Sequence, residues 1–199
     1  MKRYLQLYRE FLRCAFSEAL TYRINFVLLV LLDIIFFACS LAGVDFIFDF
    51  VPAIGPWDRD QFMLFVAFML TVDHLHMTFI SEGFWNLSFE IRTGKLDFIL
   101  LKPVWTWFPI FFRMIRVGSM ISMPLPWLCL YYFAFKVHLN LLQLFAIPLL
   151  ILLAICLLVS IEILISMSMF WTIESWGINF LRLQIQQVSR WPDFTFRYW

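Results

Sequence analysis

Long apolar runs separated by short polar stretches dominate this chain of 199 residues. Four of the runs are long enough, or nearly so, to cross the hydrocarbon core of a bilayer, which takes about 20 helical residues. They are Ile24–Ile47, Gln61–Ile80, Val117–Phe135 and Leu141–Leu158. Because lipid cannot hydrogen-bond to free backbone N–H and C=O groups, each run is predicted to form a helix. The pattern therefore predicts an all-α fold, a polytopic membrane helix bundle.

Two other segments have a weaker pattern. The apolar character of the fourth run continues past its end and then thins, which predicts a fifth, partly polar span at about Ile163–Gln184. In Lys2–Leu20, apolar side chains recur at steps of three and four residues, with basic and polar side chains on the other side. This segment is predicted to be an amphipathic helix that lies in the membrane interface or packs against the bundle. The chain should thus hold four to five membrane helices, the third of them kinked at Pro124 and Pro126 because proline removes a backbone donor.

The composition agrees with a membrane location. Hydrophobic residues make up 63% of the chain and charged residues 15%, whereas a soluble domain carries about 25% charged residues. A net charge of +1 argues against nucleic acid as a partner. The four cysteines are scattered, which is not the arrangement of a disulfide framework or a zinc site. We expect one domain, residues 1–199.

Basic residues between the runs predict how the helices are oriented, because cytoplasmic loops carry an excess of Lys and Arg. The N-terminal arm and the connection between the second and third runs are both basic, whereas the loop between the first and second runs holds four aspartates and one arginine. The basic residues of these two regions are Lys2, Arg3, Arg9, Arg13, Arg23, Arg92, Lys95, Lys102, Arg113 and Arg116. We therefore expect a multi-pass protein of the inner (plasma) membrane with its N-terminus in the cytoplasm.

The candidate catalytic and metal-binding motifs lack required residues or have unsuitable spacing. Gly94-Lys95 superficially matches the end of a phosphate-binding loop, but Leu96 stands where that loop needs Ser or Thr. His74 and His76 are two residues apart on a predicted helix, so they point to different sides and are a poor metal site. No serine has a plausible His and Asp partner in the sequence. The chain is expected to be a non-catalytic membrane subunit that binds no metal and no cofactor of its own.

Polar residues inside or beside the runs are candidates for a role in transport or in helix packing. Asp33 lies well inside the first run, where a carboxylate costs about 2.5 to 3.5 kcal/mol on insertion scales. It is expected either to lie on a transport path or to be protonated or paired with a neighbouring span. Asp73 and His76, three residues apart, are predicted to form a local hydrogen-bonded pair. Glu162 is predicted to be an exposed turn residue after the fourth run.

The segment Ile91–Val104, reading IRTGKLDFILLKPV, resembles the signature of the permease subunits of ABC-2 type transporters, in a branch known as uncharacterised ABC transport systems. Tyr22–Phe26, Phe170–Thr172 and Arg190–Pro192 are also similar to that branch. The resemblance implies about six membrane helices, each of about 20 residues. Relatives are longer and carry a last membrane helix after the tryptophan-proline segment. We expect this chain to lack that helix.

The same resemblance implies partners and a coupling site. In such exporters the permease pairs with a second permease subunit, identical or different, and with two copies of a separate ATPase that binds ATP and Mg. The cytoplasmic connection between helices two and three docks in a groove of the ATPase. Here that connection is Glu90–Val104. The expected ATPase-coupling residues are Glu90, Arg92, Gly94, Lys95, Leu96, Asp97, Phe98, Leu101, Lys102 and Pro103, and the possible pathway or interhelix polar residues are Asp33, Asp73 and His76.

The residue types of this connection suit docking on a soluble partner. Gly94 and Pro103 limit helix continuation. The charged side chains suit a soluble surface, and the apolar side chains, Ile99 among them, would form the centre of the contact. Alternatively, the basic loop only anchors the helix ends at lipid headgroups. The predicted function is accordingly the permease of an ATP-driven exporter, or else a non-transporting membrane scaffold or sensor subunit.

Overall fold

The computed structural model describes residues 2–172, 176–188 and 192, and within these residues the secondary structure is helical without strands. Ten α-helices and one 3₁₀ helix are described. In chain order they are α1 Lys2–Thr21, α2 Arg23–Phe48, α3 Arg59–Phe79, α4 Ser81–Arg92, α5 Lys95–Leu100, α6 Trp107–Phe112, α7 Val117–Ser122, α8 Pro124–Lys136, α9 Leu141–Ser166, η1 Met167–Phe170 and α10 Trp176–Val188. The predicted all-α class is confirmed.

Within the described ranges, four helical segments are long and apolar enough to cross a membrane. They are Arg23–Phe48, Arg59–Phe79, Val117–Lys136 and Leu141–Phe170. Each contains most of one predicted run, so the four spans are confirmed. Two of them begin at a reciprocal cap, in which Gln61 and Gln143 accept hydrogen bonds from the N–H groups of Asp58 and Asn140, at 3.3 and 2.9 Å.

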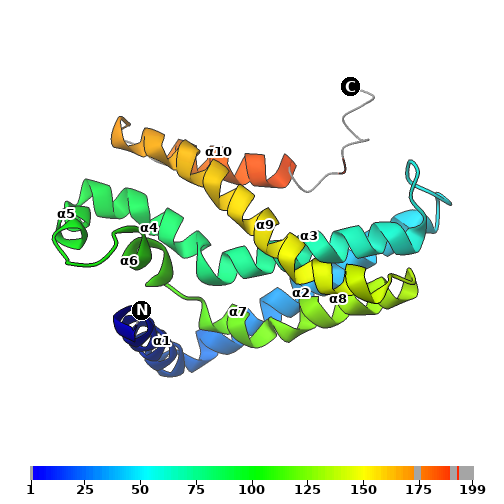
Figure 1. Cartoon of the computed structure of the whole chain (residues 1–199), viewed down its shortest axis with the longest axis horizontal. Coiled ribbons are helices and arrows are strands. Elements are labelled where there is room, and N and C mark those ends of the chain that lie inside the picture. The colour runs from blue at the N-terminus through cyan, green and yellow to red at the C-terminus, as the bar shows by residue number, and fades with distance from the viewer. Residues whose placement is uncertain (1, 173–175, 189–191, 193–199) are drawn as a thin grey trace.

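The predicted fifth span at Ile163–Gln184 is wrong. Its first residues belong to α9 and η1, and its last residues belong to α10, a separate helix that runs back beside α9 (Figure 1). The apolar run of α9 has no break at Leu158, so the helix simply continues to Ser166. The described part of α10, Trp176–Val188, has 13 residues and is about 20 Å long, less than a core of about 30 Å.

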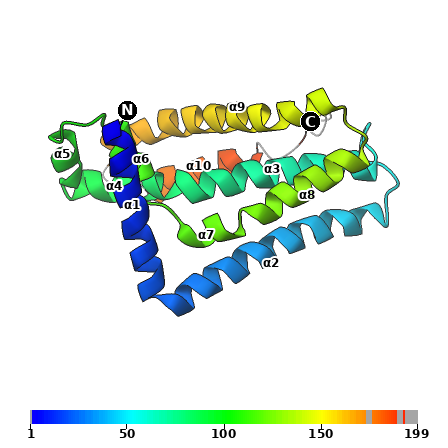
Figure 2. The ribbon, with the colours of Figure 1, turned by 60° about the horizontal axis from the view of Figure 1, so that its bottom comes forward.

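The third span is divided by its prolines, as predicted. α7 ends at Ser122 and α8 begins at Pro124, whose missing N–H is tolerated at the first position of a helix. α8 then packs along α3, where Ala67 and Ala134 are completely buried. α9 crosses over this pair of helices and completes an apolar core (Figures 1 and 2).

The two basic regions lie at the same end of the bundle. α1 sits there with α4, α5 and α6, and the loops that join α2 to α3 and α8 to α9 lie at the other end (Figure 2). The Phe108 ring of α6 lies 5.3 Å from the ring of Tyr4 and 6.2 Å from that of Phe11. The backbone N–H of Trp105 donates to the Tyr4 hydroxyl at 3.0 Å. The N-terminal helix therefore packs against the segment between spans two and three.

Candidate functional site

The segment predicted to dock on an ATPase begins with a turn made by glycine. α4 ends at Arg92, and Gly94 leads into α5 with a φ of +69°. Glycine adopts this left-handed conformation readily, whereas a side chain strains it. The Gly94 N–H donates to the Ile91 carbonyl at 3.2 Å. The turn places α5 at the extreme end of the bundle (Figure 1).

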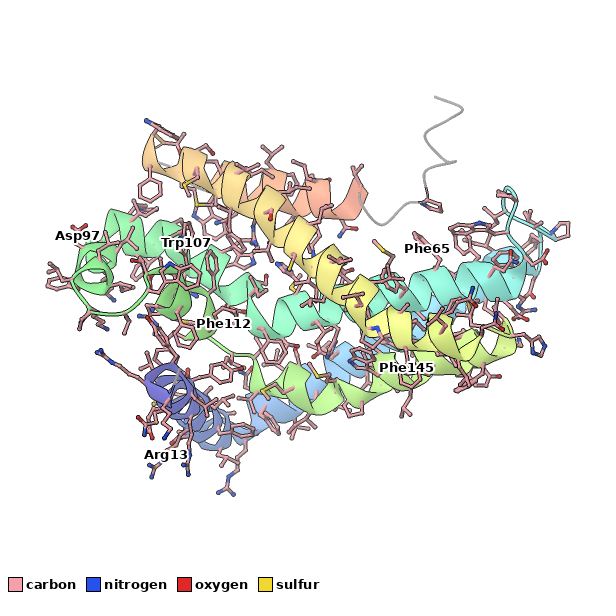
Figure 3. The ribbon with its side chains drawn as sticks, in the orientation of Figure 1. Arg13, Phe65, Asp97, Trp107, Phe112 and Phe145 are labelled. Carbon is pink, nitrogen blue, oxygen red and sulfur yellow. The ribbon has the colours of Figure 1, made fainter. Side chains whose placement is uncertain are left out.

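α5 has one buried face and one exposed face. Leu96 and Ile99, three residues apart, are buried in an apolar cluster with side chains of α4 and α6. On the other side, Phe98 is 70% exposed and Leu101 is 80% exposed, and Asp97 lies at the edge of the molecule (Figure 3). We call the exposed set the docking surface: Arg92, Lys95, Asp97, Phe98, Leu101, Lys102 and Pro103.

Two of the predicted coupling residues face the interior instead. Glu90 is 5% exposed and forms an ion pair with Arg113, which follows α6. Leu96 belongs to the buried face of α5. These two side chains tie α4 and α5 to the rest of the bundle, so a partner would meet the docking surface without them.

The backbones of α4 and α6 are in close contact at Gly83. A Cβ atom added there would lie 2.7 Å from the Ile110 carbonyl oxygen and 2.9 Å from the Phe111 Cα. Both atoms belong to the backbone, so no side-chain rotation would relieve the contact. The Phe84 and Phe111 rings pack beside it with centroids 4.6 Å apart. The docking surface is thus carried on a closely packed support.

Asp33 is paired with a neighbouring span. Its Oδ2 accepts hydrogen bonds from the hydroxyls of Ser119 at 2.7 Å and Ser122 at 3.2 Å, both on α7. His74 Nε2 lies 2.8 Å from the Ser119 carbonyl oxygen and joins α3 to the same group. The hydrogen bonds account for a carboxylate that would otherwise be costly within a span.

Asp33 also lines a cavity of about 190 Å³ between α2, α3 and α7. Asp73, His74 and Arg116 supply the other charged or titratable side chains of its wall. The remainder of the wall is mostly apolar. Asp33 is thus paired with a neighbouring span and also borders a cavity whose wall holds three other charged or titratable side chains.

The predicted Asp73–His76 pair is not formed, and the prediction for Glu162 is wrong. His76 Nε2 lies 2.6 Å from Glu162 Oε2, and His76 Nδ1 has no hydrogen-bond partner among the described residues. Asp73 Oδ1 accepts from Gln186 Nε2 at 3.1 Å. Glu162 is 1% exposed because α9 extends past it to Ser166, so it lies inside a helix and not in a turn.

α10 turns its polar side chains inward. Its buried residues are Asn179, Arg182 and Gln186, while Trp176 and Phe180 on the other side are exposed. Arg182 Nη1 donates to Glu162 Oε1 at 3.3 Å. The Arg182 guanidinium also lies 4.9 Å from the centre of the Phe84 ring, a distance typical of a cation–π contact. Polar contacts thus join α10 to α9, and through Asp73 to α3.

Burial and a neighbouring carboxylate act in opposite directions on the charge of Arg182. Burial lowers the pKa of the Arg182 guanidinium, and the neighbouring Glu162 carboxylate raises it. An arginine stays protonated under such conditions. Arg182 is therefore a buried cation whose counter-charge is Glu162.

A family model for the ABC-2 family transporter proteins matches residues 29–198. The chain belongs to the ABC-2 transporter family. The matched range takes in the docking surface, Asp33 and α10, and it confirms the resemblance of Ile91–Val104. Comparisons with curated proteins and with solved structures give no significant match.

As an ABC-2 family member, the chain is a membrane-spanning permease of an ABC transporter. Permeases of this family are generally non-catalytic and associate with an ABC ATPase subunit. Among the residues that the structure describes, no group of three or more His, Cys, Asp or Glu side chains could hold a metal ion.

The buried polar residues of α10 in this ABC-2 permease were not predicted from the sequence. Asn179, Arg182 and Gln186 are spaced by three and four residues, which puts them on one side of a helix. That spacing was available as a signal. An inward-facing polar stripe is recognisable only with its acidic partners, Glu162 and Asp73, which lie in other helices.

Proposed function

We propose that this chain is the permease of an ATP-driven exporter and that the docking surface is its contact with the ATPase. The observation that carries the proposal is the two-sided character of α5. Phe98 and Leu101 expose apolar area among charged side chains, while Leu96 and Ile99 anchor the same helix in the bundle. An exposed apolar centre with a charged rim is typical of a protein contact.

The apolar cluster beneath the docking surface is suited to transmit a movement of α5 to the membrane helices. Side chains of α4 and α6 surround Leu96 and Ile99, and Ile163 of α9 packs against the same cluster. Ile80 separates α4 from α3, and its N–H donates to the His76 carbonyl at 2.9 Å, so α4 continues almost directly from the second span. Because packed cores resist deformation, movement of α5 would shift α4 with it.

ATP and Mg are bound by the ATPase subunits, a second permease subunit completes the membrane domain, and membrane lipid surrounds it. The docking surface and the N-terminus face the cytoplasm, and the protein lies in the inner (plasma) membrane. The basic residues gathered at that end of the bundle support this orientation.

Replacement of Phe98 by aspartate should weaken binding of the cognate ATPase by about tenfold or more, because a charge would replace the apolar centre of the contact. Phe50→Asp is the matched control, since Phe50 is 73% exposed at the opposite end of the bundle. The measurement is co-purification of the ATPase from membranes, together with stimulation of ATP hydrolysis by the purified chain.

A second charge change tests the same surface. Asp97→Arg should reduce co-purification, whereas Asp49→Arg, also exposed but at the other end, should not. Undiminished ATPase binding by both Phe98→Asp and Asp97→Arg would exclude the docking role. If wild-type protein itself recovers no ATPase, the scaffold or sensor function becomes the better explanation.

Replacement of Asp33 by leucine should impair transport more than assembly. Asp33→Asn keeps an oxygen for the hydroxyls of Ser119 and Ser122 but removes the negative charge, so it separates pairing from charge. We expect both variants to recover ATPase within about twofold of wild type, since a surface far from the change is untouched. Complementation of a deletion strain by the chromosomal variants measures transport, and full complementation by Asp33→Leu would refute a role in the pathway.

A further inference from the structure

A cavity of about 250 Å³ lies directly behind the docking surface. α4, α5, α6 and the end of α9 with η1 supply its walls, and Trp107 at its edge is labelled in Figure 3. Phe84, Leu87 and Phe111 form buried parts of the wall, and Leu100, Trp107 and Phe170 are partly exposed. The cavity is therefore apolar inside and has an accessible, apolar rim.

One polar group in this wall has no partner. Ser166 lines the cavity and is 2% exposed, and its hydroxyl makes no hydrogen bond to any described residue. Several other helix hydroxyls bond to the carbonyl four residues earlier, as Ser160 does to Cys156 at 2.7 Å and Ser40 to Phe36 at 2.7 Å. Because a buried hydroxyl without a partner costs free energy, the Ser166 hydroxyl is suited to bind a ligand atom.

The size of the cavity sets the class of ligand. An apolar cavity of about 150 Å³, engineered in another protein, stays dry and binds benzene. The cavity behind α5 is larger and equally suited to an apolar molecule, and Ser166 adds a single hydrogen-bonding position. A matching ligand is a compact hydrophobic molecule of medium chain length that carries one hydroxyl or carbonyl oxygen.

The geometry points to a binding site for such a hydrophobic alcohol or ketone between α5 and α9, and to a role for it in coupling. Leu96 and Leu100 of α5 line the cavity together with Ile163 of α9 and Met167 of η1. An empty cavity lets α5 move inward without displacing α9, whereas a filled one transmits the movement. The coupling role, but not the binding, rests on the proposed function.

Photolabelling with 3-azioctanol tests the binding. The full chain in lipid nanodiscs is irradiated with the probe, and labelled peptides are identified by mass spectrometry. We expect saturable labelling of peptides from α4, α6 and η1, competed by 1-octanol. Ser166→Phe should fill the cavity and reduce this labelling about tenfold, and Ser166→Ala should weaken binding about fivefold through loss of one hydrogen bond.

Ser160→Phe is the matched control, because Ser160 lies on the exposed side of the same helix. It should leave the labelling unchanged. Labelling of wild-type protein that does not saturate, or that spreads evenly over the lipid-facing side chains of α2, would overturn the binding site whether or not the variants fold. Equal labelling of Ser166→Phe and wild type would do the same.

ATP hydrolysis by the reconstituted complex tests the coupling role. 1-Octanol should raise the stimulated rate of wild type about twofold over the concentrations that saturate labelling, and it should leave Ser166→Phe unchanged. Saturable labelling with an unaltered rate would overturn the coupling role alone. A chain that binds the probe but never stimulates the ATPase would instead contradict the proposed function.

Discussion

Replacement of Glu162 by leucine should cost the protein about 3 to 5 kcal/mol of stability, because it removes the counter-charge of a buried arginine. Arg182 is 1% exposed and donates to Glu162 at 3.3 Å. The same substitution removes the hydrogen-bonding partner of His76 Nε2. Unfolding of the purified protein in one fixed detergent, followed by temperature or denaturant, measures the loss.

A double variant shows whether the loss comes from the unpaired charge. Glu162→Leu combined with Arg182→Met removes both charges and keeps similar volumes, so most of the stability should return. Glu10→Leu, an exposed glutamate of α1, should change stability by no more than about 0.5 kcal/mol. A double variant no more stable than Glu162→Leu alone would contradict the ion-pair explanation.

Replacement of Gly83 by alanine should destabilise the protein by about 3 kcal/mol and disrupt ATPase coupling as well. The new Cβ would meet the Ile110 carbonyl oxygen at 2.7 Å, so α4 and α6 would have to separate, as in an overpacked core. Separation would displace the apolar cluster on which α5 rests. The measurements are unfolding of the purified chain and stimulation of ATP hydrolysis.

Gly43→Ala supplies a control of opposite sign. Gly43 lies inside α2, and nothing is within 4 Å of the position of its Cβ. Alanine there should stabilise the helix by up to about 1 kcal/mol, because glycine loses more conformational freedom on folding. If Gly83→Ala and Gly43→Ala change stability equally, the close contact between α4 and α6 has no energetic weight.

The membrane helices were predictable because a helix in lipid must be long, continuous and apolar. The break at Pro124 was predictable for a similarly local reason, the missing backbone donor. The fifth span failed because the same local pattern does not say where one helix stops when the apolar run continues, as it does from Leu158 to Ser166 in α9. The prediction for Glu162 was wrong for the same reason, because this residue lies inside the continued helix.

Side-chain contacts between different helices could not be predicted from the local sequence pattern. Asp73 and His76 have suitable spacing for a pair within α3, yet they form hydrogen bonds with Gln186 of α10 and Glu162 of α9. In the candidate docking segment, the spacing of Leu96 and Ile99 put them on one side of a helix. Only the packing of α4 and α6 determined that this side faces inward and that Phe98 faces outward.

The inward polar stripe of α10 constrains the order in which the helices assemble during synthesis. An unpaired arginine within a bilayer costs about 2.5 to 3.5 kcal/mol. The acidic partners of the stripe, Glu162 and Asp73, lie in α9 and α3, which are made earlier. We expect α10 to wait at the membrane surface, held by Trp176 and Phe180, until both helices are inserted. The Arg182–Glu162 ion pair would then form as α10 docks against α9.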